Sequence, residues 1–130
     1  MVNLLSSEYV PGVCNIGPAE RRMRLHIGEA GLGVTMLFAA AALIFNFATP
    51  WRLLIFLPAF VSALGYLQYF MHFCAKFAFT GVINFSNKIG PTDSVEQAEF
   101  RRMDRAKALM ILVDSAAIAG LAAGVLAILQ

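Results

Sequence analysis

The chain has 130 residues, of which 59% are hydrophobic and only 14% are charged, whereas a soluble domain has roughly 45–50% and 25%. A soluble domain of this size buries only about 60–70% of the surface that its unfolded chain exposes, so it could not hide this much apolar surface from water. The net charge of +2 favours no nucleic-acid partner, and the composition predicts an all-α integral membrane protein.

Residues 1–29 are predicted to be a segment outside the membrane that ends in an amphipathic helix start. Gly17 and Pro18 indicate that start, because proline at the first helical position lacks only an N–H that has no partner there. Glu20 and Arg24 stand four residues apart, in the order that favours a side-chain pair. Three basic residues of this segment are Arg21, Arg22 and Arg24. The favoured interpretation is an ordinary surface helix start with snorkelling arginines, and the functional one is that they face anionic lipid or an acidic partner.

Two apolar runs predict a tight antiparallel helical hairpin. Residues 30–48 are uncharged, and about 19 residues at 1.5 Å each nearly cross a hydrocarbon core of about 30 Å. Residues 49–52 are predicted to be an external turn, in which Pro50 ends the first helix and Trp51 anchors the chain at the interface. Residues 53–75 form the second predicted transmembrane helix.

Residues 76–107 are predicted to be a charged loop and the lead-in to a third helix. Gly90 and Pro91 resemble the first helix start, and Asp93 with Glu96 has the spacing of a capping box, so we expect the lead-in helix to begin here. The same two interpretations apply to three basic residues of this lead-in: Arg101, Arg102 and Arg105.

Residues 108–129 form the third predicted transmembrane helix, which contains a single charged residue, Asp114. A carboxylate at full depth costs about 2.5–3.5 kcal/mol. Pairing with Lys107 or a headgroup-level water, or contact with the Ser115 hydroxyl, would lower that cost. A polar contact with a partner subunit and proton or ion handling are the functional alternatives.

The third span also carries small residues at four-residue intervals, namely Ala116, Gly120 and Gly124. Such a row lets another helix approach closely. Asp114 lies roughly 200° from Ala116 around the helix at 100° per residue, so it is on a different face. The sequence therefore predicts that one side of this span packs within the chain and another side meets a second molecule.

The basic residues predict how the spans are oriented. Nine of the ten Lys and Arg residues lie within 1–29 or 76–107, and Arg52 alone lies in the turn between the first two spans. Lys and Arg concentrate on the cytoplasmic side of membrane proteins. We therefore expect the N-terminus and long loop in the cytoplasm, the turn and Gln130 outside, and a bacterial inner membrane as the location.

Three residues near the cytoplasmic surface are candidate ligands or thiols. His26 and His72 lie at similar predicted depth, so a haem or pigment ligand pair is an open alternative, although hydrogen-bonded interfacial histidines are the favoured interpretation. Cys74 is a candidate reactive thiol because Lys76 is close in sequence. No metal-ligand spacing and no catalytic motif is present, so we predict no enzyme activity, no metal and no cofactor.

Segments 15–28 and 72–82 carry a pattern that resembles the small two-helix inner-membrane family of unknown function, which also occurs fused to membrane-bound rhodaneses. The resemblance covers about residues 15–85 and implies a membrane hairpin. Cys74 and Gly81 fit the signature that closes the family's second helix, although alanine replaces the usual proline after the cysteine. The resemblance would make Cys74 the residue to link with sulfur chemistry.

These features favour a non-catalytic accessory or scaffold subunit of a larger, bioenergetic membrane complex. Its expected partners are membrane lipids and other transmembrane subunits. An oligomeric transporter of small anions or sulfur species, or a thiol-linked membrane protein, is one alternative. Histidine-ligated haem or pigment binding is the other.

Overall fold

The computed structural model describes residues 9–85, 88–90 and 92–129, which are mostly helical. Two very short strands, β1 and β2, pair antiparallel, with Val82 opposite Ser94 and Ile83 opposite Asp93. The fold is mostly helical, as predicted, with one small two-stranded sheet that the sequence did not indicate. The elements in chain order are α1 (Pro18–Ile44), α2 (Thr49–Arg52), the 3-10 turn η1 (Leu53–Ile55), α3 (Phe56–Met71), α4 (Ala75–Thr80), β1 (Val82–Ile83), β2 (Asp93–Ser94) and α5 (Ala98–Ile128).

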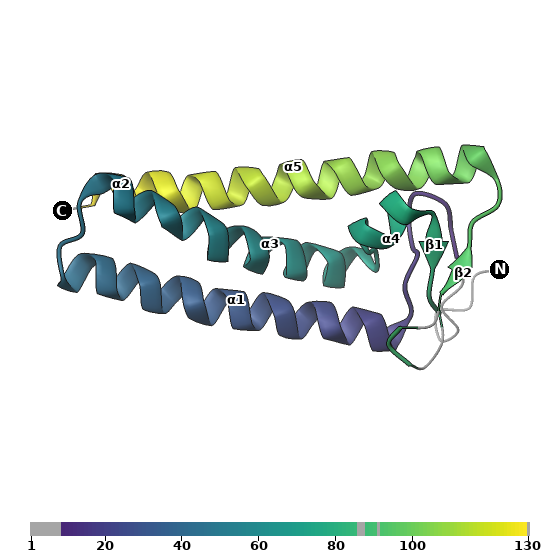
Figure 1. The fold of residues 1–130 in the computed structure, drawn as a ribbon, viewed down its shortest axis with the longest axis horizontal. Helices are drawn as coiled ribbons and strands as arrows, with labels where there is room; N and C mark the ends of the chain where they lie inside the picture. Colours follow the sequence, from purple (N-terminus) through teal and green to yellow (C-terminus); the bar gives the residue numbers. More distant parts are fainter. Residues whose placement is uncertain (1–8, 86–87, 91, 130) are drawn as a thin grey trace.

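The molecule is an elongated bundle in which α3 lies between α1 and α5 (Figure 1). One end carries α4, β1, β2 and the N-terminal segment 9–17, which together we call the cap. The opposite end carries the turn between α1 and α2 and the C-terminal end of α5. Among the described residues, three helical stretches are long and apolar enough to span a membrane, as the sequence predicts: Pro18–Ile44, Thr49–Met71 and Ala98–Ile128.

The boundaries of the first two spans differ from those predicted. The first lead-in and span form one continuous helix, α1, which begins at Pro18 as expected and already ends at Ile44. Thr49–Arg52 is helical rather than a turn, because Pro50 lies in the first turn of a helix, where its missing N–H costs nothing. The second span ends at Met71, since His72 adopts a left-handed backbone with φ of 54°.

The lead-in to α5 is also shorter than predicted. Asp93 belongs to β2 instead of capping a helix, and α5 begins only at Ala98 with no side-chain cap. Pairing with β1 satisfies the backbone of this segment and competes with helix formation. The predicted helix start at Gly90 is therefore wrong, and Pro91 lies outside the described residues.

Small residues bring α1 and α3 into backbone contact. A Cβ placed on Gly65 would lie 2.5 Å from the Gly28 nitrogen, and one on Gly31 would lie 2.8 Å from the Ser62 nitrogen. The Ser62 hydroxyl donates to the Gly28 carbonyl at 2.9 Å. In lipid, helices associate through this kind of close packing and interhelical hydrogen bonding, so these residues hold the predicted hairpin together.

The second helix pair, α3 and α5, buries a stripe of mostly small residues on α5. Ile111, Ser115, Ala119 and Ala123 repeat every four residues and are all buried, so they share one face of the helix. Its last three members each lie one position before a residue of the predicted packing row, which is Ala116, Gly120 and Gly124. The chain therefore packs α5 through a different face from the one that the glycines marked.

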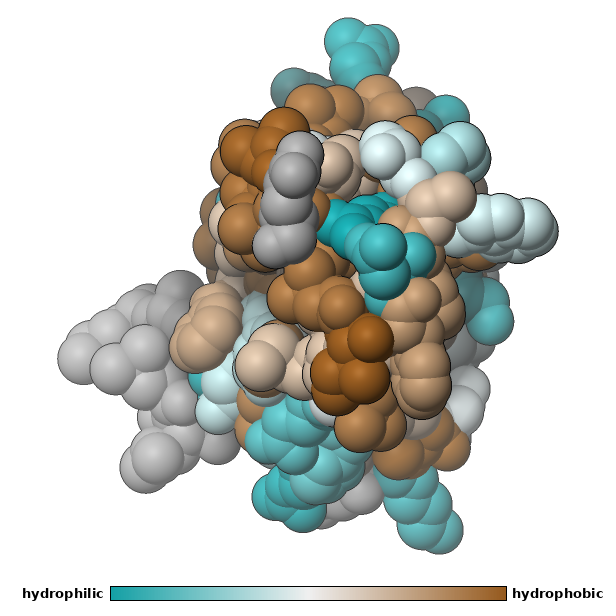
Figure 2. Space-filling model, turned by 90° about the vertical axis from the view of Figure 1, so that its left-hand side faces the viewer, coloured by the Kyte–Doolittle hydropathy of each residue, from teal (hydrophilic) through white to brown (hydrophobic). Residues whose placement is uncertain are grey.

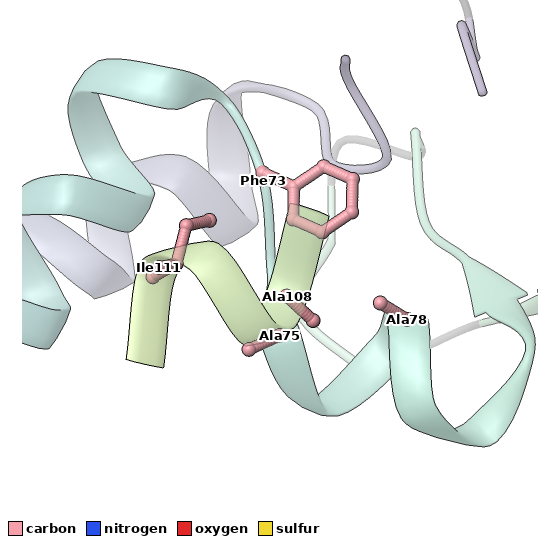
Figure 3. Packing of buried hydrophobic residues seen from close by; sticks show 5 residues of the cluster. All are labelled: Phe73, Ala75, Ala78, Ala108 and Ile111. Atoms are coloured by element: carbon pink, nitrogen blue, oxygen red, sulfur yellow. The ribbon is translucent and has the colours of Figure 1, made fainter. Parts of the chain in front are cut away.

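Two apolar clusters hold the ends of the bundle. At the cap, α4 packs on α5 through five buried side chains shown in Figure 3: Phe73, Ala75, Ala78, Ala108 and Ile111. Four others close the opposite end: Ala42, Ile55, Ala123 and Leu126. Figure 2 looks onto that opposite end, where a hydrophilic patch lies among hydrophobic residues. The cap thus rests on the same helices that form the predicted spans.

Candidate functional site

A buried polar network lies where the cap meets α1, and Asn15 is its first member. Asn15 is fully buried, and its amide nitrogen donates to the Cys74 carbonyl at 3.0 Å while its amide oxygen accepts from the Cys74 backbone nitrogen at 2.6 Å. Its backbone also bonds to His72 and Asn84. One asparagine therefore connects the N-terminal segment to the chain on both sides of α4.

Glu20 is the second member, and its carboxylate is fully satisfied. One oxygen accepts from Arg24 at 3.1 Å. The other accepts from the Asn84 amide at 2.9 Å and the Gly90 backbone nitrogen at 3.0 Å. Glu20 is 2% and Arg24 6% exposed, and such a buried pair needs these extra hydrogen bonds to offset desolvation. The predicted side-chain pair is thus confirmed, inside the protein rather than on its surface.

Arg24 also contacts the candidate thiol. Its second terminal nitrogen lies 2.9 Å from the Cys74 sulfur, and its guanidinium carbon lies 5.7 Å from the centre of the Phe77 ring. Cys74 is only 1% exposed. The predicted neighbour of this thiol was Lys76, whereas the cation that reaches the sulfur is Arg24, because the left-handed turn at His72 redirects the chain toward α1.

A cavity of about 900 Å³ adjoins this network. Its polar wall contains Glu20, Arg24, Gln68, Cys74 and Lys76, and the remaining wall is mostly apolar. The Gln68 side chain is itself held in place by the Ala75 backbone nitrogen, which donates to it at 2.9 Å. A mostly apolar space with charged groups in its wall suits an amphiphilic molecule better than a water-soluble substrate.

The six predicted surface arginines fall into three groups. Arg24 is buried, which corrects its predicted orientation toward lipid or a partner, since Glu20 and Cys74 hold it inside. Arg21 donates to the Tyr69 carbonyl at 2.8 Å and stacks 4.2 Å above its ring, and Arg101 donates to two backbone carbonyls near β2. The remaining three are exposed: Arg22, Arg102 and Arg105.

The two predicted histidine ligands have separate surroundings. His26 lies on the exposed surface of α1, with its ring 3.6 Å from the Glu29 carboxylate. His72 ends α3, and its carbonyl accepts from the Asn15 nitrogen. No group of three or more His, Cys, Asp or Glu side chains that could hold a metal occurs in the part of the chain that the structure describes. Haem or pigment binding stays a prediction without a site.

Asp114 and the glycines of α5 find no partner within the part of the chain that the structure describes. Asp114 is partly exposed and has no hydrogen bond or ion pair with any described residue, so the predicted pairing with Lys107 is absent. The Ser115 hydroxyl donates to the Ile111 carbonyl instead. A Cβ added at Gly120 or Gly124 would meet nothing within 4 Å.

Two polar contacts were not anticipated from the sequence. Asp104 is fully buried and accepts from the Tyr9 hydroxyl at 2.7 Å and the Gly12 backbone nitrogen at 2.8 Å. Burial and this hydrogen bond raise the pKa of the Tyr9 hydroxyl above its ordinary range. Burial likewise raises the pKa of the Cys14 thiol. These contacts fix the N-terminal segment to the start of α5.

Arg52 plays the corresponding role at the other end of the bundle. It is 5% exposed and donates to the Phe47 carbonyl at 2.8 Å, the Asn46 side chain at 3.1 Å and the Leu126 carbonyl at 3.2 Å. It also donates to the Leu129 carbonyl. A cation is favourable at a helix C-terminus, so Arg52 joins the end of α5 to the turn after α1.

Comparisons with protein-family models, with curated proteins and with solved structures give no match to this chain. The resemblance to the two-helix inner-membrane family therefore stays a prediction.

Proposed function

We propose that the chain is a non-catalytic accessory or scaffold subunit of a larger membrane complex, and that it binds its partner through contacts between transmembrane helices. In this proposal the cap lies in the cytoplasm of a bacterial cell and the three long helices cross the inner membrane. The complex would be a bioenergetic one, where small helical subunits surround a larger core.

The distribution of charge supports this orientation. Nine of the ten Lys and Arg residues belong to the cap or the adjoining ends of α1 and α5, and Arg52 alone belongs to the opposite end. Because Arg52 donates to backbone carbonyls of its own chain, it is a structural residue rather than a topogenic signal. The Lys and Arg residues that set the orientation in the membrane are therefore those at the cap end.

Asp114 carries the proposal of a partner. The described chain supplies neither a hydrogen bond nor a cation for its carboxyl group, although the residue lies within an apolar span. At full depth an unpaired carboxylate costs about 2.5–3.5 kcal/mol. A hydrogen-bond donor or cation from a second transmembrane protein would remove this cost, and such residues face protein rather than lipid in membrane bundles.

The glycine row strengthens the same proposal. Gly120 and Gly124 are exposed on α5 and have open space in front of them, while the buried stripe on α5 already provides the contact with α3. Small residues at four-residue spacing allow close approach of a second helix. The faces that contain Asp114 and the glycine row are both accessible to a partner that wraps around α5.

Gentle solubilisation tests the proposal. Membranes containing the protein are dissolved in a mild detergent and separated on a native gel, where we expect the chain in an assembly much larger than itself. Asp114→Val should release it from that assembly, Asp114→Asn should retain part of the assembly because an amide still forms hydrogen bonds, and the control Val34→Ala, at an exposed position of α1, should change nothing. A wild-type chain found only as a free monomer would contradict the proposal.

The contact between Arg24 and Cys74 favours one second candidate, a thiol-linked or sulfur-species transport function. The sulfur lies on a cavity wall beside a guanidinium group, but three helices enclose little pathway, so transport would need an oligomer. Flux of thiosulfate into reconstituted vesicles should fall in Cys74→Ser and Asp114→Asn if this candidate holds. Unchanged flux in both variants would exclude it.

A further inference from the structure

The cavity next to the cap continues along the bundle as a groove that we call the lateral groove. Its apolar wall is built by Ile27 of α1, Val61 and Leu64 of α3, and Leu112 of α5, with Phe79 of α4 at the cap end. Several of these side chains are open to the outside, including Ile27 at 39% and Val61 at 44% exposed. The groove is therefore accessible from the side of the bundle, where lipid chains would lie.

Arg24 brings unused hydrogen-bond donors to the polar end of this groove. A guanidinium group has five N–H donors, and within the described residues Arg24 directs one to Glu20 and one to Cys74. Three donors are left on a side chain that is 94% buried and lines the groove. No buried side-chain nitrogen or oxygen of the described residues lacks a hydrogen-bond partner, so these N–H groups are additional donors on the groove wall that an acceptor from another molecule can use.

Lys76 gives the polar end of the groove a net positive charge. It is exposed on α4, lines the groove, and forms no ion pair within the described residues. Glu20 is the only carboxylate among the described residues of the wall, and both of its oxygens are occupied by Arg24, Asn84 and Gly90. Two cations against one satisfied carboxylate select a ligand that is anionic at this end.

We propose that the lateral groove binds one anionic phospholipid of the surrounding bilayer, with its phosphate oxygens held by Lys76 and the free N–H groups of Arg24. One acyl chain lies along α3 against Val61 and Leu64. The position agrees with this, because Lys76 belongs to α4 in the cap, whereas Val61 and Leu112 belong to the long helices α3 and α5 that extend away from it. Headgroup and acyl chain thus meet matching surfaces.

Native mass spectrometry of the detergent-solubilised protein tests this proposal. The protein is incubated with an equal mixture of phosphatidylglycerol and phosphatidylcholine that have identical acyl chains. We expect one retained lipid per chain, predominantly phosphatidylglycerol. Equal retention of the two lipids would overturn the proposal. Complete displacement by excess inorganic phosphate would also overturn it, because a headgroup site alone would then account for binding.

A charge variant and its control separate a built site from general attraction to basic protein. Lys76→Gln should lower retention of phosphatidylglycerol about fivefold, the change that corresponds to about 1 kcal/mol for one basic residue near anionic lipid. Lys107→Gln removes the same charge from a residue that does not line the groove and should leave retention unchanged. Equal losses in both variants would overturn the site.

A second pair of variants tests the acyl-chain wall. Val61→Trp fills the groove from an exposed position and should lower retention of phosphatidylglycerol about as much as Lys76→Gln. Val113→Trp places the same ring on an exposed part of α5 outside the groove and should have no effect. Asp114 does not line the groove, so Asp114→Val should retain lipid normally even where it loses the partner subunit. Retention unaffected by Val61→Trp would contradict the placement of the acyl chain.

Discussion

Two aspartates on α5, ten residues apart, have opposite surroundings. Asp104 is fully buried and accepts hydrogen bonds from Tyr9 and Gly12 of the N-terminal segment. Asp114 is partly exposed in the apolar part of the same helix and has no such contact within the described residues. The first carboxylate is explained by this chain alone, whereas the second points to a molecule outside it.

Two buried arginines show the same difference. Arg52 directs its donors to the Asn46 side chain and to backbone carbonyls at the two ends it joins. Arg24 has a carboxylate and a sulfur as partners and keeps donors beside the lateral groove. Polar groups that the fold satisfies therefore indicate structural roles, and polar groups that it leaves open are where we propose that ligands and partners bind.

The largest effect is expected from removing the carboxylate that compensates Arg24. Glu20→Leu leaves a buried guanidinium group unpaired, which typically destabilises a protein by about 3–5 kcal/mol. Glu29→Leu removes a carboxylate from an exposed pair with His26, and should change stability by less than about 1 kcal/mol. Unfolding in mixed detergent with increasing denaturant measures both variants. Equal stability of the two would contradict the assigned role of Glu20.

A somewhat smaller effect is expected where α1 and α3 touch. Gly65→Ala places a methyl group on the Gly28 backbone and should destabilise the hairpin by about 1–3 kcal/mol through overpacking. Gly33 is on α1 with nothing within 4 Å of an added Cβ, so Gly33→Ala should be neutral or stabilising. The same unfolding experiment compares them. If Gly65→Ala left the stability unchanged, α1 and α3 would have to lie further apart than the structure has them.

The contact between the N-terminal segment and α5 should contribute less. Tyr9→Phe removes one partly buried hydrogen bond to Asp104, which keeps the bond from Gly12, and should lower stability by about 0.5–1.5 kcal/mol, the usual net range for one hydrogen bond. The raised pKa of Tyr9 means that its hydroxyl stays protonated in the folded state after the unfolded chain has ionised. The stabilisation is thus fully present below about pH 10 and declines above it. A difference between wild type and Tyr9→Phe that grows above pH 10 would contradict this sign.

The smallest effect is a difference in cysteine labelling. Cys14 is partly exposed and Cys74 is 1% exposed, so a maleimide should label Cys14 first. Because burial raises the pKa of Cys14, its labelling rate should still be low at neutral pH and should keep rising above pH 9. Mass spectrometry of peptides after timed labelling at several pH values measures this. Faster labelling of Cys74 would contradict its burial.

Much of the fold follows from the sequence because hydrophobic length and proline position act locally. Three helices that are long and apolar enough to span a membrane and the start of α1 at Pro18 are confirmed, and so is the pair formed by Glu20 and Arg24. The start of α5 could not be found in this way. Asp93 has capping-box spacing, but pairing of β2 with β1 decides its conformation, and that pairing depends on a distant segment.

The buried network was largely missed for the same reason. Asn15, Cys74 and Asn84 meet only because the chain reverses direction after α3 and again after α4. A local signal was present for the contact between α1 and α3, since small residues are spaced three apart in both helices: Gly28, Gly31, Ser62 and Gly65. Polar residues flanked by apolar ones, as at Asn15 and Asn84, are the signal that could have indicated the cap.

Photo-cross-linking in intact membranes tests most directly whether the open side of α5 meets a partner. A photoreactive amino acid replaces Ile118, which is 47% exposed and lies roughly 40° from Asp114 around the helix. Replacement of Leu37, which is 74% exposed on α1, is the control. We predict a discrete heavier protein adduct from position 118 that is absent from position 37 and is lost in Asp114→Val. Lipid adducts alone at both positions would contradict the account.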